Sequence, residues 1–162
     1  MDLMDESLLE FWKSLNNFGV KYIMVGGVAV NLHGYSRTTK DIDIWIKDTK
    51  DNRRQLGLAF AKFGYDEINL EDFQFVPGWT DFYIGSGIRL DVLIKMVGLE
   101  GYSFDECLNI ASVADIENIL VPFLQINQLI ANKKAVNRSK DQVDVMELEN
   151  IIRVTKELGS NK

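Results

Sequence analysis

The chain has 162 residues, of which 46% are hydrophobic and 26% charged, so it is long enough for one globular domain whose buried core needs no disulfide or metal staple. Its formal net charge of -6 argues against bulk binding to DNA or RNA, because that affinity comes largely from Lys and Arg that neutralise phosphates. The single cysteine, Cys107, and the single histidine, His33, exclude an internal disulfide and a structural zinc site with four Cys or His ligands.

The N-terminal segment is acidic where a signal peptide would be basic. No apolar run approaches the ~20 residues that a membrane span requires. We therefore expect a cytoplasmic protein with no membrane anchor, whose partners are small molecules, proteins or a single RNA end.

The first third of the chain predicts helices alternating with short strands. Ser7 and Glu10 have the spacing of a capping box, and apolar residues then recur at helical intervals. A β-branched and aromatic run follows, bounded by glycines, as expected for a buried strand. The expected elements are a helix over 7–18, a strand over 20–25, a turn at Gly26 and Gly27, a short helix over 28–33 and a polar loop over 35–40.

Residues 41–46 alternate between acidic or aromatic and isoleucine side chains. In a strand this places Asp41, Asp43 and Trp45 on one face and the isoleucines on the other, facing the core. A helix then follows, capped by Asp48, Thr49 or Asp51, with Leu56, Ala59, Phe60 and Phe63 on its buried face and Gly64 at its end.

The second half of the chain predicts a hairpin and then helices. Residues 80–84 and 88–94 flank Gly85-Ser86-Gly87, whose glycines permit the positive φ of a tight turn. Residues 65–78 indicate only a strand or irregular structure. Further on we expect a short helix or turn over 103–110 and a helix from Pro122 to about Ala135 with Leu129 and Ile130 in the core. The last expected helix covers 141–158, with Val145, Leu148 and Ile152 on one face.

This order of elements predicts an α/β or α+β fold with a mixed sheet, flanking helices and a helical C-terminal part. No repeat, low-complexity segment or linker divides the chain. We expect one domain over residues 1–162, with its core in about 1–96 and its helical part in about 102–162.

Two aspartates at positions i and i+2 of one strand point to the same side, with Cβ atoms roughly 6.5 Å apart. Asp41 and Asp43 can therefore converge on one or two divalent ions, and Asp91 in a neighbouring apolar strand can complete the ligand set. The alternative is a pair of acidic residues exposed at a strand end. Three carboxylates facing one another would need a cation to compensate their charge.

The other candidates are ambiguous when each is taken alone. A Gly-Gly pair after a strand is often only a turn, and neither a Rossmann nor a P-loop fingerprint is present. Arg37 is most simply a solvated loop residue, although beside a phosphate it would supply paired donors. His33 reads as a packing residue at a helix end, and Cys107 as a small buried hydrophobe.

Several motifs in order are more specific than any one of them. They are G-G-x-A-x-x-x-H-G at 26–34, R-T-T-K-D-I-D-I at 37–44, R-L-D-V at 89–92 and the segment 129–144. Together they resemble the nucleotidyltransferase superfamily related to DNA polymerase β. The resemblance is to its small bacterial members, which include lincosamide- and aminoglycoside-modifying enzymes and toxin–antitoxin nucleotidyltransferases.

This resemblance implies a mixed sheet that carries Asp41 and Asp43 as ligands of Mg²⁺ or Mn²⁺. Asp91 would be the third ligand and a general base for an acceptor hydroxyl. Gly26 and Gly27 would hold the phosphates of a nucleoside triphosphate such as ATP.

Lys133, with Arg138 or Lys140, would approach the triphosphate or tie the C-terminal helices to the site. The alternative for these residues is a surface charge paired with Asp141 or Asp144.

The chain departs from the superfamily pattern in two ways. The second residue of the usual Gly-Ser pair is Gly27, which removes a hydroxyl that could contact phosphate. No separate acceptor-binding domain follows the core. A small-molecule or protein acceptor would then bind to local helices, to a second copy in a homodimer, or to a partner protein.

Two functions from different classes follow. The first is a metal-dependent enzyme that transfers a nucleoside monophosphate from a nucleoside triphosphate to a hydroxyl and releases pyrophosphate. The alternative is a non-catalytic nucleotide-binding protein or toxin–antitoxin partner with the same fold. Addition of nucleotides to RNA ends is disfavoured by the acidic charge.

Overall fold

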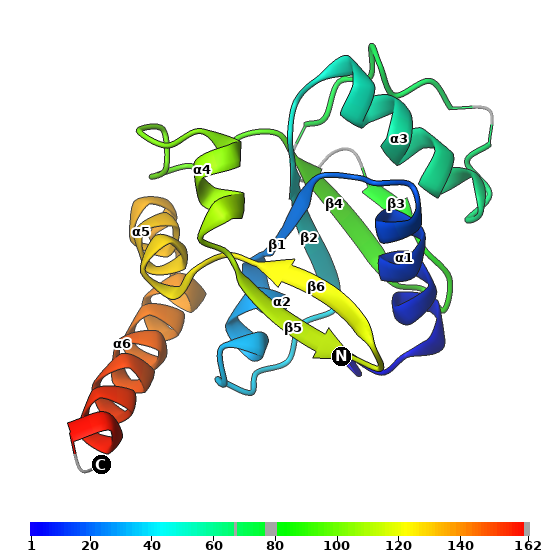
Figure 1. Cartoon of the computed structure of the whole chain (residues 1–162). Coiled ribbons are helices and arrows are strands. Elements are labelled where there is room, and N and C mark those ends of the chain that lie inside the picture. Colours follow the sequence, from blue (N-terminus) through cyan, green and yellow to red (C-terminus); the bar gives the residue numbers. More distant parts are fainter. Residues whose placement is uncertain (67, 77–80, 161–162) are drawn as a thin grey trace.

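The computed structural model describes residues 1–66, 68–76 and 81–160, and in this part of the chain a mixed six-stranded sheet is flanked by six helices (Figure 1). The predicted α+β class is thereby confirmed. The strands are β1 (Tyr22–Val25), β2 (Asp41–Ile46), β3 (Asp81–Tyr83), β4 (Arg89–Leu93), β5 (Ser112–Ile116) and β6 (Ile119–Phe123). The helices are α1 (Glu6–Asn17), α2 (Gly26–Leu32), α3 (Lys50–Ala61), α4 (Phe104–Asn109), α5 (Ile126–Val136) and α6 (Ser139–Ser160).

The strand order is β3-β4-β2-β1-β6-β5. β2 lies antiparallel to β1 and parallel to β4, while β1 pairs in parallel with β6 through Met24 and Phe123. The hairpins β3–β4 and β5–β6 form the two outer pairs of strands. β1 and β2 therefore lie at the centre of the sheet, where both of their edges are paired.

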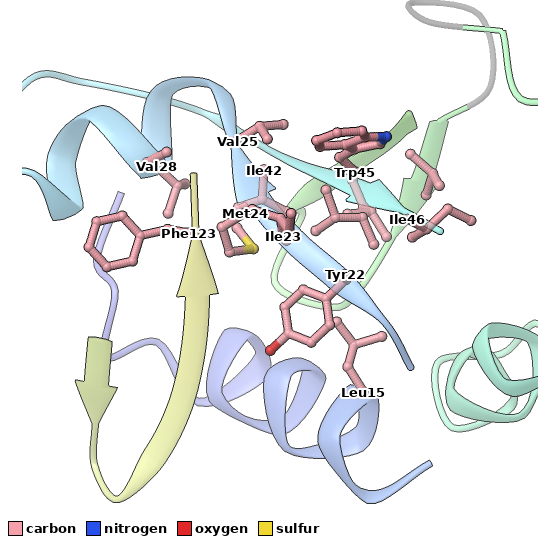
Figure 2. Packing of buried hydrophobic residues seen from close by; sticks show 14 of the residues in the cluster. Leu15, Tyr22, Ile23, Met24, Val25, Val28, Ile42, Trp45, Ile46 and Phe123 are labelled. Carbon is pink, nitrogen blue, oxygen red and sulfur yellow. The ribbon is translucent and has the colours of Figure 1, made fainter. Parts of the chain in front are cut away.

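One face of the sheet is covered by α1 and α3. The isoleucines of β2 are fully buried against this layer, as the alternation predicted, and the indole N–H of Trp12 on α1 donates to the Met24 sulfur at 3.3 Å. Figure 2 shows Tyr22 and Leu15 close to each other where α1 packs against β1. This face is the main hydrophobic core, and it fixes which side of β2 the aspartates take.

The opposite face is covered only in part. Trp45, which shares this face with Asp41 and Asp43, is 5% exposed because the ring of Phe104 on α4 packs on it edge to face at 5.1 Å. The two aspartates, nearer the start of β2, are only partly buried. The strand therefore carries its polar site at one end and a second patch of core at the other.

The first two helices start differently from the predictions. Asp5 caps α1, accepting from the backbone N–H groups of Ser7 and Leu8, so the expected capping box at Ser7 is wrong. An aspartate two residues earlier offers the free N–H groups of the first turn a charged acceptor. α2 begins directly at Gly26, where a turn was expected.

The hairpin β5–β6 replaces the helix that Pro122 was expected to start, and that prediction is wrong. Residues 117 and 118 form a two-residue turn with φ values of 51° and 66°, which joins Ile116 to Ile119. Paired residues alternate between hydrogen-bonded and non-hydrogen-bonded positions, which places Pro122 opposite Val113 in a non-hydrogen-bonded pair. The missing N–H of proline therefore removes no bond to β5.

The remaining predictions agree with the structure where residues are described. α3 is capped by Thr49, α4 by a capping box at Ser103, and β3–β4 form the predicted hairpin. Residues 65–76 are irregular where they are described, and residues 67 and 77–80 of the predicted segments lie outside the described part.

The last two helices pack on each other, and Figure 1 shows α6 extending from α5 away from the sheet. Leu148 is buried, and Val145 and Ile152 are half-buried on the same side of α6, as predicted. None of the helices in the described ranges is long and apolar enough to cross a membrane.

Candidate functional site

The predicted acidic residues meet on two neighbouring parallel strands. Asp43 of β2 and Asp91 of β4 are direct partners in the ladder, so their side chains leave the same face of the sheet side by side. The sequence suggested that Asp91 could join Asp41 and Asp43. The structure supplies the reason, since β4 is inserted next to β2 and in register with it.

Asp41, on the same strand as Asp43, is paired with an arginine. It is the ladder partner of Arg89, and the Asp41 Oδ2 accepts a hydrogen bond from Arg89 Nη2 at 2.7 Å in a half-exposed ion pair. Within residues 1–66, 68–76 and 81–160, no three acidic, histidine or cysteine side chains are grouped closely enough to hold a metal ion. The structure therefore brings Asp43 and Asp91 together and turns the carboxylate of Asp41 to an arginine.

The electrostatics of Asp43 reflect this crowding. Burial raises the pKa of the Asp43 carboxyl, the neighbouring charge of Asp91 raises it further, and Lys133 opposes the rise, with a net pKa of about 6. Asp41 adds to the rise and Arg138 opposes it. Asp43 thus lies between a cluster of negative charge on the strands and positive charge on the C-terminal helices.

Gly26 brings the start of α2 against this carboxylate. Its φ is +64°, and a Cβ built on it would lie 2.2 Å from Asp43 Oδ2. A side chain at this position is excluded both by the backbone conformation and by the aspartate. The glycine therefore lets the first turn of the helix approach the carboxylate, which no other residue would allow.

Gly27 is surrounded by the polar loop that precedes β2. A Cβ at this position would lie 2.8 Å from Thr39 Oγ1 and 2.9 Å from Arg37 Nη2. Arg37 is thereby placed beside the start of α2, close to both predicted phosphate-binding glycines. Thr39 itself donates to the backbone carbonyl of Asp41 at 3.0 Å.

Lys133 is buried, with 3% of its surface exposed. Its Nζ lies 3.1 Å from Asp141 Oδ1 and 3.0 Å from Asp144 Oδ2, and both aspartates are at most 1% exposed. The alternative of a paired surface charge is therefore half right. The pairing exists, but the lysine and its partners lie inside the junction of α5 and α6.

Two arginines extend this cluster at either end. Arg37 Nε lies 3.1 Å from Asp144 Oδ1, and Arg138 Nε lies 2.7 Å from Asp141 Oδ2. Burial alone would raise the pKa of the Asp141 carboxyl, but hydrogen bonds from Arg138 and Lys133 lower it to about 2. We call these five residues the cation chain: Arg37, Asp144, Lys133, Asp141 and Arg138.

The donor set suits a hard divalent cation. Mg²⁺ and Mn²⁺ bind carboxylate oxygens, and two adjacent carboxylates, of which Asp91 raises the pKa of Asp43, offer the excess negative charge that such an ion compensates. Asp41, whose Oδ2 accepts from Arg89, does not lie close enough to them in the described structure to complete a group of three ligands. Asp43 and Asp91 thus fit the predicted ion as they stand, whereas Asp41 fits it after a change of side-chain conformation.

Three participants were missed in the sequence. From the sequence, Asp141 and Asp144 were predicted only as partners of surface charges, and Arg89 was noted only as part of the R-L-D-V motif. Asp141, Asp144 and Leu148 recur at helical spacing on the buried side of α6, and this pattern was the available signal.

Comparison with known proteins supports the fold. The sequence matches no protein-family model and no curated protein. The structure is similar to the lincosamide antibiotic adenylyltransferase LnuA bound to lincomycin, with a TM-score of 0.60 and 16% identity over 91% of this chain and 97% of that one. It is also similar to an antigenic nucleotidyltransferase-like protein from Paracoccidioides brasiliensis, with a TM-score of 0.58 and 17% identity over 91% of this chain and 73% of that one.

At this level of identity the likeness concerns the fold. The chain has a nucleotidyltransferase-like fold, as the motifs predicted.

Proposed function

We propose that this protein transfers a nucleoside monophosphate from a nucleoside triphosphate to a hydroxyl acceptor. The observation that carries this proposal is the placement of Asp43 and Asp91 side by side, between the glycine start of α2 and the cation chain. Carboxylates suit a metal ion, and arginines suit phosphate oxygens. Such a site can hold the metal complex of a triphosphate across its two halves.

In this reaction the acceptor oxygen forms a bond to the α-phosphorus. The bond from that phosphorus to the oxygen bridging to the β-phosphate breaks, and pyrophosphate leaves. Mg²⁺ or Mn²⁺ bound by Asp41, Asp43 and Asp91 would polarise the phosphate and lower the pKa of the acceptor hydroxyl. Asp91 is the residue that would accept the proton of that hydroxyl.

The remaining residues act on the phosphates. Gly26 and Gly27 keep the start of α2 close to Asp43 and Arg37, which lie where a Cβ would stand at each position, so that the metal-binding carboxylate and the guanidinium reach the same phosphates. Arg37 supplies guanidinium donors beside them. Lys133 adds positive charge from within the cation chain, where both of its carboxylate partners hold it in place.

The first test is a thermal-shift screen of the four nucleoside triphosphates with Mg²⁺ or Mn²⁺, since a ligand that binds only the folded state raises the unfolding temperature. The second follows the label from an α-labelled triphosphate into candidate hydroxyl compounds and into the protein itself. No shift with any triphosphate, in protein shown to be folded, would contradict the proposal.

The ion pair between Arg89 and Asp41 favours a second candidate. If the pair persists when nucleotide binds, the site lacks one of its three carboxylates, and the protein is a non-catalytic nucleotide-binding or toxin–antitoxin partner protein. Arg89→Ala separates the two. An enzyme would transfer the label as wild type and keep transfer in Arg89→Ala, whereas in a binding protein blocked by the ion pair the wild type would show no transfer and only Arg89→Ala could gain it.

A further inference from the structure

The space beside the Cα of Gly27 is already filled by side chains of the loop before β2. Thr39 Oγ1 and Arg37 Nη2 lie 2.8 and 2.9 Å from the position that a Cβ would take. Unlike Gly26, Gly27 does not have a positive φ, so its backbone conformation is open to any residue. A larger residue at position 27 would therefore require the side chains of Thr39 and Arg37 to move.

Arg37 is held in this place from two directions. Its backbone N–H donates to Asn31 Oδ1 at 3.0 Å, and its Nε lies 3.1 Å from Asp144 Oδ1. Asp144 is 1% exposed and is itself held by Lys133, so it provides a rigid anchor. The carboxylate of Asp144 lies on the Nε side of the guanidinium without accepting a hydrogen bond from Nε, while Nη2 lies beside the start of α2 and can donate to an anion there.

We propose that Arg37 replaces the side chain missing at position 27 as the phosphate donor of this site, and that Asp144 is the residue that positions it. The inference rests on the proposed function, because it assigns the triphosphate contact of that site. In the Gly-Ser pair of the superfamily that the sequence resembles, a hydroxyl would occupy this volume. Here the volume is shared by the Thr39 side chain and Nη2 of Arg37, and the guanidinium brings a full charge that a serine hydroxyl lacks.

This arrangement couples positions 27 and 37. Restoring a serine at position 27 would not add a donor to the site, because the new Cβ would displace the Arg37 guanidinium. A serine and an intact Arg37 therefore exclude each other. The two substitutions should affect the same interaction and not two separate ones.

The experiment is calorimetric titration with inorganic tripolyphosphate in the presence of Mg²⁺. Arg37→Ala should weaken binding about tenfold or more, as expected for a charge-assisted contact. Gly27→Ser should weaken it to a similar degree. The double variant should bind no more weakly than Arg37→Ala alone.

Arg54→Ala is the matched control, because Arg54 is an exposed arginine that pairs with Glu71 and Asp51 on the other side of the sheet. It should leave the affinity unchanged. Unfolding temperatures establish that each variant is folded, and Arg37→Gln takes the place of the alanine variant if that one unfolds. Additive losses in the double variant, full affinity in Arg37→Ala, or no binding by the wild type would each overturn the proposal.

The positioning role of Asp144 is tested in the same cycle. Asp144→Asn leaves Lys133 its contact with Asp141 but removes the charged partner of Arg37. It should weaken tripolyphosphate binding severalfold in the wild type, and most of that effect should vanish in the Arg37→Ala background. An equal loss in both backgrounds would show that Asp144 acts on the site without Arg37.

The outcomes separate this inference from the proposed function. Tripolyphosphate carries no nucleoside, so its binding is measured without turnover. Transfer by the wild type together with unchanged binding in Arg37→Ala would overturn the inference and leave the proposed function standing. Weakened binding in Arg37→Ala together with no transfer by the wild type would support the role of Arg37 in phosphate binding and overturn the proposed transfer reaction.

Discussion

The two halves of the site are built in different ways. The carboxylate half lies on adjacent strands, where Asp43 and Asp91 share a face because the ladder places them side by side. The cation chain lies between a loop and two helices, where Lys133 is buried by two aspartates of α6. The strands arrange like charges that repel, whereas the helices arrange alternating charges that attract. The first half therefore gains from a ligand of opposite charge, and the second is stable without one.

The largest expected effect tests the carboxylate half. Asp43→Asn should reduce nucleotidyl transfer by on the order of 10³-fold or more, since the metal site loses a charged ligand. The fold should stay intact or become more stable, because an amide of the same size does not repel Asp91. Incorporation of α-labelled nucleotide measures the first effect and urea unfolding the second. Asp51→Asn, at an exposed carboxylate of α3, is the control, and unchanged transfer in Asp43→Asn would refute the assignment.

The next effect tests the cation chain. Lys133→Met should lower the free energy of unfolding by about 3 kcal/mol, because it removes one partner from a buried set of charges. Lys134→Met, one position along α5, removes an exposed lysine and should change the free energy by less than about 0.5 kcal/mol. Urea titrations of both variants decide the matter. Similar values for the two lysines would mean that the burial of Lys133 carries no energetic weight.

A smaller effect on stability is expected at Gly26, where the start of α2 meets Asp43. Gly26→Ala places a Cβ in a left-handed conformation and against Asp43, at a cost of about 1–3 kcal/mol in unfolding free energy. Gly101→Ala is the control, because open space surrounds Gly101. The stabilities of the two variants are compared by thermal unfolding. An equally stable Gly26→Ala would show that α2 can move away from Asp43.

The smallest effect concerns His33, which ends α2 and whose Nε2 contacts the Leu124 carbonyl before α5 at 2.7 Å. Burial lowers the pKa of the His33 imidazole, although the contact with Leu124 opposes this. The folded state thus favours the neutral ring. Its contribution to stability is complete above the unfolded pKa of about 6.5 and is lost as the pH falls through the lower folded value.

Because His33 is the single histidine, its proton signals in an NMR titration report this pKa without ambiguity. The difference in unfolding free energy between wild type and His33→Gln should change with pH in the same range. A measured pKa above 6.5 would reverse the expected sign.

Much of the carboxylate half could be predicted from the sequence. Strand alternation has a period of two, so the pattern D-I-D-I already places Asp41 and Asp43 on one face. The partnership of Asp43 with Asp91 depends on which strands neighbour each other, and a local pattern does not contain that information. The arginine at Asp41 follows from the same register and was missed for the same reason.

The cation chain was harder to predict, since charged residues on a helix are usually solvated. Lys133 is buried only because α5 and α6 meet at that point, and no local signal marks such a meeting. The hairpin β5–β6 was missed because a proline near an apolar run favours a helix start. The two-residue turn at Glu117 and Asn118 was the signal against that interpretation, with Asn118 suited to positive φ.

The place of β6 in the sheet has a consequence for how the chain matures during synthesis. β6 pairs with β1 through Phe123 and Met24, which lie far apart in the sequence, so one edge of β1 stays open until the second half of the chain has been made. A nascent chain that has reached residue 96 holds both central strands but exposes backbone N–H and C=O groups along β1. Open strand edges of this kind favour aggregation, and in this protein the pairing of β6 with β1 removes that edge once residues 112–123 have been made.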